Sequence, residues 1–122
     1  MRKVWGNAIT PVGYSAGAGG TVTQITSKAT GVTLDKLCGT ITLHNAALAA
    51  AAIVSFTVTN AQATATDVVT IQHDSDGTVG KYLVSANTMA AGSFGVTVTN
   101  ISAGNLSEAI VLRFAIIRAV IA

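Results

Sequence analysis

Hydrophobic and hydroxyl-bearing residues alternate over residues 53–60 (IVSFTVTN), and a very similar pattern returns at residues 93–100 (SFGVTVTN). β-Branched residues at a period of two fit a pleated sheet with one buried face. Each copy ends at an asparagine, which tolerates the turn that must follow a strand. We therefore predict two repeated β-strands in which Phe56 and Phe94 are matched core residues.

Each copy of the repeat leads through a polar loop to an acidic residue and then to an apolar segment. The acids are Asp67, before residues 68–71, and Glu108, before residues 109–112. Their equivalent positions predict a structural role rather than a catalytic one. We expect each carboxylate to accept hydrogen bonds from loop amides just before a strand.

Further segments have strand-like composition; they are residues 21–26, 31–34, 39–43, 68–73, 81–86 and 109–122. The Asp-Gly step within residues 74–80 predicts a hairpin between two of them. The alanine-rich residues 45–52 predict a short connection packed through Leu48, with a helical turn as the alternative. Short strands separated by turns predict an all-β fold, an antiparallel β-sandwich of about eight strands and of jelly-roll type.

Residues 109–122 are apolar at nearly every position except Arg113 and Arg118, which predicts a strand buried on both faces. Its β-branched residues favour strand over the alternative of a helix. The segment is too short and too charged to cross a bilayer, which takes about 20 apolar residues. The two arginines point to opposite faces of a regular strand, so at least one is expected to meet a carboxylate of a partner.

Residues 1–20 have no hydrophobic period and end in a glycine-rich joint, which predicts a flexible N-terminal arm before a domain at residues 21–122. Trp5 and Tyr14 are large rings for a solvated tail, so we expect the arm to dock on its own domain or on a neighbour. The N-terminal residues contain no uninterrupted hydrophobic segment, so we expect no export signal. The lone Cys38 excludes an intrachain disulfide and is expected to be a buried, inert thiol.

The amino-acid composition predicts an unusually apolar surface. Only 10% of the residues are charged and 50% are hydrophobic, whereas about a quarter of residues are charged in typical domains. Part of this apolar surface is therefore expected to belong to a partner. Alanine carries much of the excess, so small flat surfaces explain it as well as large apolar patches do. The seven cations are scattered and the net charge is +2, which argues against a nucleic-acid partner.

The residues that could carry chemistry form no recognisable site. Residues 74–77 lack the further ligands of a calcium loop and are expected to form a turn. His44, His73 and Cys38 do not have the spacing of a zinc site. Residues 13–20 are rich in glycine, but no Lys-Ser/Thr follows as in a phosphate loop, and no nucleophile elbow is present. We therefore expect a protein without catalytic residues, metal or cofactor.

Five segments together carry a resemblance to a known group of proteins; they are GTVTQITSKATGVTL at residues 20–34, GTITL at 39–43, VSFTVTN at 54–60, DVV at 67–69 and SAGNLSEA at 102–109. They resemble a family of small virion proteins of tailed bacteriophages. Members of this kind resemble head decoration, or cement, proteins that bind the outer capsid, and similar segments occur in phage fibre proteins. No catalytic residue comes with this family.

The resemblance implies a non-enzymatic decoration protein on the outside of the phage head, assembled in the bacterial host cytoplasm. Its expected partners are the major capsid protein and itself, as a homodimer or homotrimer, with neither nucleic acid nor membrane involved. Many copies can stabilise a shell even if each contact is weak. We select Trp5, Tyr14, Arg113 and Arg118 as candidate interface residues.

The alternative is a trimeric phage fibre or head-spike module that binds a host surface receptor or glycan. Glycan sites often present exposed aromatic rings. Outside the arm, Tyr82 is the ring expected to be available for such a role, since Phe56, Phe94 and Phe114 lie on apolar strand faces. The scarcity of other rings favours the decoration hypothesis.

Overall fold

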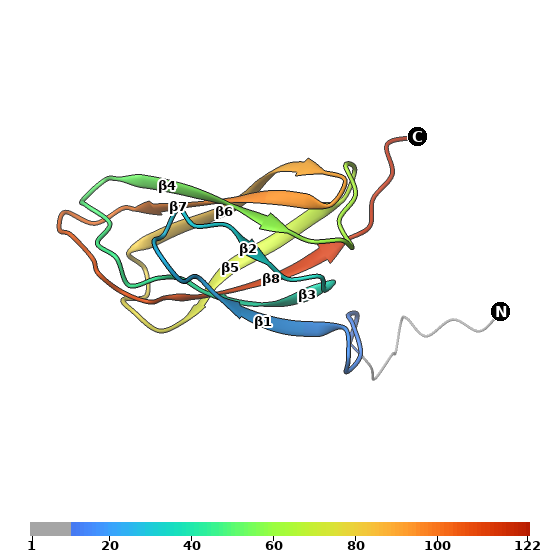
Figure 1. The fold of residues 1–122 in the computed structure, drawn as a ribbon, viewed down its shortest axis with the longest axis horizontal. Helices are drawn as coiled ribbons and strands as arrows, with labels where there is room; N and C mark the ends of the chain where they lie inside the picture. Colours follow the sequence, from blue (N-terminus) through green and yellow to red (C-terminus); the bar gives the residue numbers. More distant parts are fainter. Residues whose placement is uncertain (1–10) are drawn as a thin grey trace.

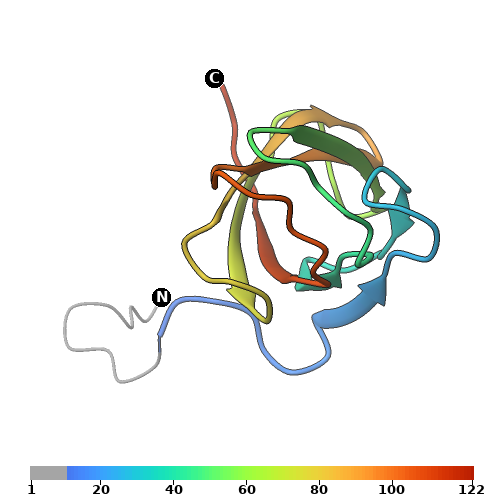
Figure 2. The same ribbon diagram turned by 90° about the vertical axis from the view of Figure 1, so that its left-hand side faces the viewer.

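The computed structural model describes residues 11–122 and shows an all-β sandwich (Figure 1). Its strands are β1 (Gly19–Thr23), β2 (Val32–Thr33), β3 (Cys38–Thr42), β4 (Ile53–Thr59), β5 (Val68–Ser75), β6 (Tyr82–Ala90), β7 (Ser93–Asn100) and β8 (Val111–Ile117). Sheet A has the order β1-β3-β8-β5, and sheet B has the order β2-β4-β7-β6. Viewed from its end, the molecule consists of two curved layers around one core (Figure 2). The expected eight-stranded sandwich is confirmed.

The chain passes from one sheet to the other after every strand except β6, which forms a hairpin with β7. The chain therefore alternates between the two layers along most of its length. Both sheets are mixed rather than purely antiparallel, because β1 pairs with β3 and β2 with β4 in parallel. Each of these strands runs opposite to the strand that follows it on the other sheet (Figure 1). Strands β1 and β3 therefore run in the same direction, as do β2 and β4, and each pair lies side by side in one sheet.

The hairpin expected at residues 74–80 is wrong, because β5 belongs to sheet A and β6 to sheet B. The segment is nevertheless a tight turn. Asp76 and Gly77 have left-handed backbones, with φ values of 59° and 69°, and an Asp-Gly step suits this conformation. A Cβ on Gly77 would lie 2.5 Å from Ile110. The local turn was therefore predictable, but its role as a crossover between sheets was not.

The two copies of the repeat, β4 and β7, lie side by side and antiparallel in sheet B. Phe56 is opposite Val96, and Phe94 is opposite Val58. Both phenylalanines are buried, with exposed fractions of 4% and 1%. Phe94 also packs on Phe114 of sheet A, with 5.6 Å between ring centroids. The prediction that both rings belong to the core is confirmed, and the repeat builds the centre of one sheet.

Each repeat ends in a fully buried asparagine that organises the following turn. Asn60 and Asn100 both accept a hydrogen bond from the backbone amide two residues further on, at 2.8 and 2.9 Å. Their amide groups donate to the carbonyls of Lys36 and Leu48, at 2.7 and 2.8 Å. The buried asparagines therefore satisfy backbone groups where the chain leaves the sheet.

Strand β8 is buried on one face only, so the expectation of burial on both faces is wrong. Leu112, Phe114 and Ile116 point into the core, whereas Arg113 and Ile117 are exposed on the outer face of sheet A. No second layer of strands covers that face in the part of the chain that the structure describes. The strand ends at Ile117, before the second arginine.

Residues 45–52 form an irregular connection rather than a helix, and Leu48 pairs with Leu106 in an isolated bridge. Leu48 is buried, so the predicted packing role of this residue is confirmed. Residues 11–122 contain no helix that is long and apolar enough to cross a membrane.

Candidate interaction surfaces

A groove of about 1120 Å³ lies over the outer face of sheet A, beside the segment of the arm that precedes β1. Two rows of residues that are neighbours across the strands form its floor; they are Gly19, Cys38, Ala115 and Thr70, and then Thr21, Thr40, Arg113 and Gln72. In Figure 2, the chain before β1 passes outside this sheet. The groove is therefore bounded on one side by the protein's own arm.

The groove brings together three of the four candidate interface residues, since Tyr14, Arg113 and Arg118 all line it. The Tyr14 hydroxyl donates a hydrogen bond to the carbonyl of Ile116, while the side chain remains 45% exposed. This part of the arm thus lies on its own sandwich. Trp5 lies outside the described residues.

Gly19 and Gly20 begin strand β1, although the sequence placed them in the arm. They pair with Cys38 and Gly39 in the parallel ladder to β3. A Cβ on Gly39, whose φ is 159°, would lie 2.2 Å from the Gly20 carbonyl oxygen. The glycines therefore allow two strands to approach closely, and the first strand starts two residues before the predicted boundary at residue 21.

Arg113 forms a two-pronged ion pair with Asp74 on the outer face of sheet A. Its Nε and Nη2 donate to the two carboxylate oxygens at 2.9 and 3.1 Å. These hydrogen bonds hold the pKa of Asp74 below its ordinary value, and the same contact raises the pKa of Arg113. The arginine side chain is 60% exposed, so it needs no carboxylate from a partner.

Arg118 follows the end of β8 and pairs with Asp67, its Nε lying 2.8 Å from Asp67 Oδ1. The contact is an ion pair without a well-aligned hydrogen bond to that oxygen. Arg118 also donates to the Gln62 carbonyl at 2.9 Å. The premise that the two arginines occupy opposite faces of one strand is therefore wrong, and each of them has a carboxylate of its own chain as counter-charge.

Asp67 has the structural role that the sequence predicted. Its side chain is fully enclosed, and Oδ2 accepts the backbone amide of Thr64 at 3.0 Å, just before β5. Burial by itself would raise the pKa of this carboxyl. The hydrogen bonds from Thr64 and the charge of Arg118 outweigh that effect and lower the pKa.

We expect Arg118→Ala to lower the thermal midpoint by several degrees and Arg113→Ala to lower it much less. Arg118 is the counter-charge of an enclosed carboxylate, whereas Arg113 and Asp74 are accessible to solvent, where ion pairs contribute little. Thermal melts of both variants, with the exposed Lys81→Ala as a control, would check this ranking. Equal midpoints for the two arginine variants would contradict it.

Glu108 also binds a loop amide, but in a loop distant in sequence. Its carboxylate accepts the Thr78 backbone amide at 3.1 Å, the Thr78 hydroxyl at 2.8 Å and the Tyr82 hydroxyl at 2.8 Å. These hydrogen bonds lower the pKa of Glu108, while burial and the neighbouring carboxylate raise the pKa of Tyr82. Tyr82 is only 7% exposed. The expectation that its ring is available as a glycan platform is therefore wrong.

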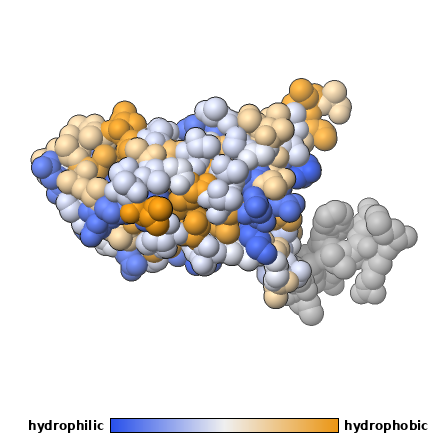
Figure 3. Space-filling model, in the orientation of Figure 1, coloured by the Kyte–Doolittle hydropathy of each residue, from blue (hydrophilic) through white to orange (hydrophobic). Residues whose placement is uncertain are grey.

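An apolar cluster lies at one end of the outer face of sheet B, and we define it as Ile53, Leu83 and Ile101. Ile53 and Leu83 flank Thr99 across three strands. The three side chains are 67%, 62% and 57% exposed. A signal for it existed in the sequence, because Ile53-Val54 and Leu83-Val84 interrupt the alternation of apolar and polar residues. Figure 3 shows hydrophobic residues in separate patches, one of them near the start of β4.

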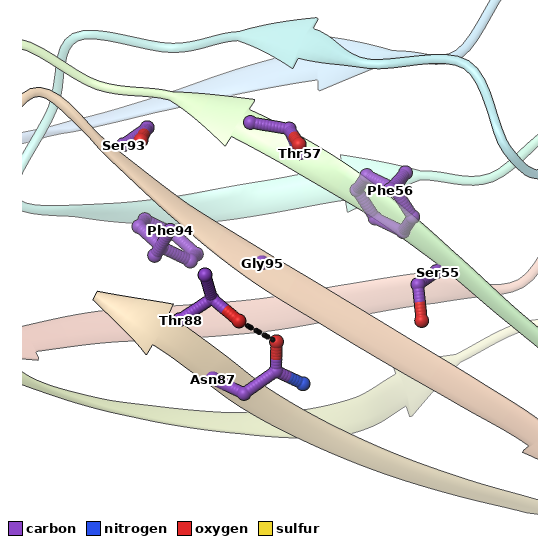
Figure 4. A pocket seen from close by; sticks show the side chains of 8 residues that line it. All are labelled: Ser55, Phe56, Thr57, Asn87, Thr88, Ser93, Phe94 and Gly95. Carbon is purple, nitrogen blue, oxygen red and sulfur yellow. Dashed lines mark hydrogen bonds between the residues drawn. The ribbon is translucent and has the colours of Figure 1, made fainter. Parts of the chain in front are cut away.

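A polar hollow of about 220 Å³ lies elsewhere on sheet B, where Gly95 has no side chain (Figure 4). Asn87 lies across this glycine, and a Cβ on Gly95 would be 2.5 Å from Asn87 Oδ1. Thr88, at a bulge in β6, has a left-handed backbone with φ of 52° and donates to Asn87 at 3.0 Å. The hollow therefore presents hydroxyl and amide groups on a shallow surface.

Among residues 11–122, no three histidine, cysteine, aspartate or glutamate side chains are grouped so that they could hold a metal ion. His73 instead packs edge-on against Tyr82, with ring centroids 5.5 Å apart. Cys38 is half-buried at the floor of the groove rather than buried in the core. Comparisons with protein-family models, with curated proteins and with solved structures found no match for this chain.

Proposed function

We propose that this protein is a non-enzymatic decoration protein that binds the outer surface of a tailed-phage head and stabilises contacts between major capsid subunits. The observation that supports it best is the apolar cluster on the outer face of sheet B. The cluster belongs to regular strands and to the residue directly after β7. Burying such side chains against a partner contributes roughly 25 cal/mol per Å² of apolar area.

The apolar cluster suits this role better than the exposed apolar residues outside the strands do. Val79 lies in a loop, and Val120 and Ile121 lie beyond the last strand. The outer face of sheet A is partly occupied by the arm through Tyr14. A partner that binds the cluster meets a preformed surface, so little conformational entropy is lost on binding.

The direct test is a cryo-EM map of the virion of the phage that encodes this chain. We expect density for the sandwich on the outside of the head, with sheet B toward the major capsid protein. Density for the chain at the tail or on a fibre would favour the alternative of a trimeric fibre or head-spike module. The polar hollow beside Gly95 is the feature that favours this alternative, because sugars are bound through hydroxyl and amide groups.

We expect Leu83→Glu to reduce the affinity for purified heads by about tenfold or more, equivalent to about 1.4 kcal/mol. The carboxylate would have to lose its hydration in an apolar contact. Co-sedimentation of the protein with heads that lack it would measure the change. The matched control is Val68→Glu, because Val68 is similarly exposed, at 53%, but lies on sheet A. Normal binding of Leu83→Glu together with weak binding of Val68→Glu would place the capsid contact on the other sheet.

A further inference from the structure

The groove over sheet A has a floor of small residues that suits a large ring, and the chain carries such a ring, Trp5, nine residues before Tyr14 at the groove. We propose that the groove is the docking site for the chain's own residues 1–10, with the Trp5 side chain over the row of Gly19, Cys38 and Ala115. This inference does not depend on the proposed role in a phage head. It assigns an intramolecular binding site to a surface that sheet A otherwise leaves open.

The floor of the groove suits a large planar ring. Gly19, Cys38 and Ala115 are small residues that are neighbours across three strands. Together with the surrounding residues they leave a space of about 1120 Å³. An indole ring buries more apolar area than almost any other side chain and has an N–H that can reach a polar neighbour. Thr21, Thr40 and Thr70 line the same groove and carry hydroxyl groups that could accept it.

The chain is already anchored beside the groove. The hydrogen bond from Tyr14 to the Ile116 carbonyl fixes the arm on β8, and Val12 also lines the groove while remaining fully exposed. Trp5 is nine residues before Tyr14, which corresponds to at most about 30 Å of extended chain. The groove therefore lies within reach of Trp5.

The anchor also decides which copy of the arm occupies the groove. A segment tethered by a short linker has an effective concentration in the millimolar range at a site within its reach. The arm of a second molecule would compete only at comparable protein concentrations. Docking of the chain's own residues is therefore favoured in dilute solution.

Two native reporters make the proposal testable, because Trp5 is the single tryptophan and Cys38 the single cysteine of the chain. In the full-length protein we expect Cys38 to react slowly with a thiol reagent such as dithionitrobenzoate. Deletion of residues 2–10 and the substitution Trp5→Ala should each accelerate the reaction by about tenfold, corresponding to 1.4 kcal/mol of docking free energy. Equal rates for all three proteins would overturn the proposal.

The reciprocal experiment observes Trp5 itself. Thr70→Arg places a long charged side chain at the floor of the groove, and Thr70 is exposed, so the fold should persist. We expect the Trp5 emission to shift to longer wavelength and to become more accessible to acrylamide. The control is Thr57→Arg, at an exposed threonine on sheet B. Unchanged Trp5 emission in Thr70→Arg, or the same shift in both variants, would contradict docking in this groove.

Protein concentration distinguishes the chain's own arm from that of a second copy. Protection of Cys38 by the chain's own arm is independent of concentration. Protection that disappears on dilution, together with a larger particle in sedimentation velocity, would show that a second copy supplies the arm and would overturn the intramolecular assignment. Circular dichroism of the deletion variant tests separately whether the sandwich still folds.

Discussion

Replacing Phe94 with alanine is expected to lower the free energy of unfolding by about 3–5 kcal/mol, a large part of the 5–15 kcal/mol typical of a domain. Phe94 is 1% exposed and packs on Phe114 of the opposite sheet. The truncation removes this contact between the layers and leaves a cavity that the rigid strands cannot fill. Urea denaturation followed by circular dichroism would measure the loss.

The same substitution at Phe56 should cost a similar amount, because this ring is 4% exposed in the paired copy of the repeat. Thr57→Ala is the matched control, since Thr57 is the next residue of β4 but lies on the outer face. A neutral Phe56→Ala variant beside a strongly destabilised Phe94→Ala variant would show that the two rings are not energetically equivalent. Both variants should retain an unfolding transition with unchanged dependence on denaturant.

The second large effect is expected at Lys28, where we predict that Lys28→Met lowers the free energy of unfolding by about 2–4 kcal/mol. Lys28 is 3% exposed, and its ammonium donates to the backbone carbonyls of His44, Ala46 and Glu108. Methionine retains most of the volume but leaves these three acceptors without their donor. Urea denaturation would quantify the effect.

Lys81→Met is the control for this prediction, because Lys81 is exposed and its substitution should be nearly neutral. Burial lowers the pKa of Lys28, against a smaller opposing effect of the Glu108 charge. A Lys28→Met variant as stable as Lys81→Met would show that the three carbonyls find other donors. Lys28 is therefore a buried cation of the fold, although its sequence context resembles that of an exposed one.

The strand content and much of the core were predictable from the sequence, because the side-chain period of a strand is a local property. Alternation at residues 53–60 and 93–100 placed Phe56 and Phe94 inside without knowledge of their partners. Asp67 was recognisable as a loop acceptor because its Thr64 donor is three residues away. Each of these features depends on neighbours within a few positions along the chain.

The candidate surfaces were only partly predictable. The sequence singled out Tyr14, Arg113 and Arg118 as separate residues, and the structure places all three around one groove. The apolar cluster of sheet B was missed, although two pairs of adjacent apolar residues signalled it. A hydrophobic residue beside another can turn inward or outward, and only the pairing of β4, β6 and β7 decides which one remains exposed.

By itself, the sequence determined that the chain forms a β-sandwich with a repeated strand and with few charged residues on its surface. Only the tertiary structure decided that residues 74–80 cross between sheets, that β8 is open on one face, and that Lys28 and Tyr82 are buried. A turn has the same local chemistry whether the next strand joins the same sheet or the opposite one. Sheet membership depends on pairing between residues distant in the chain, and the burial of each side chain follows from that pairing.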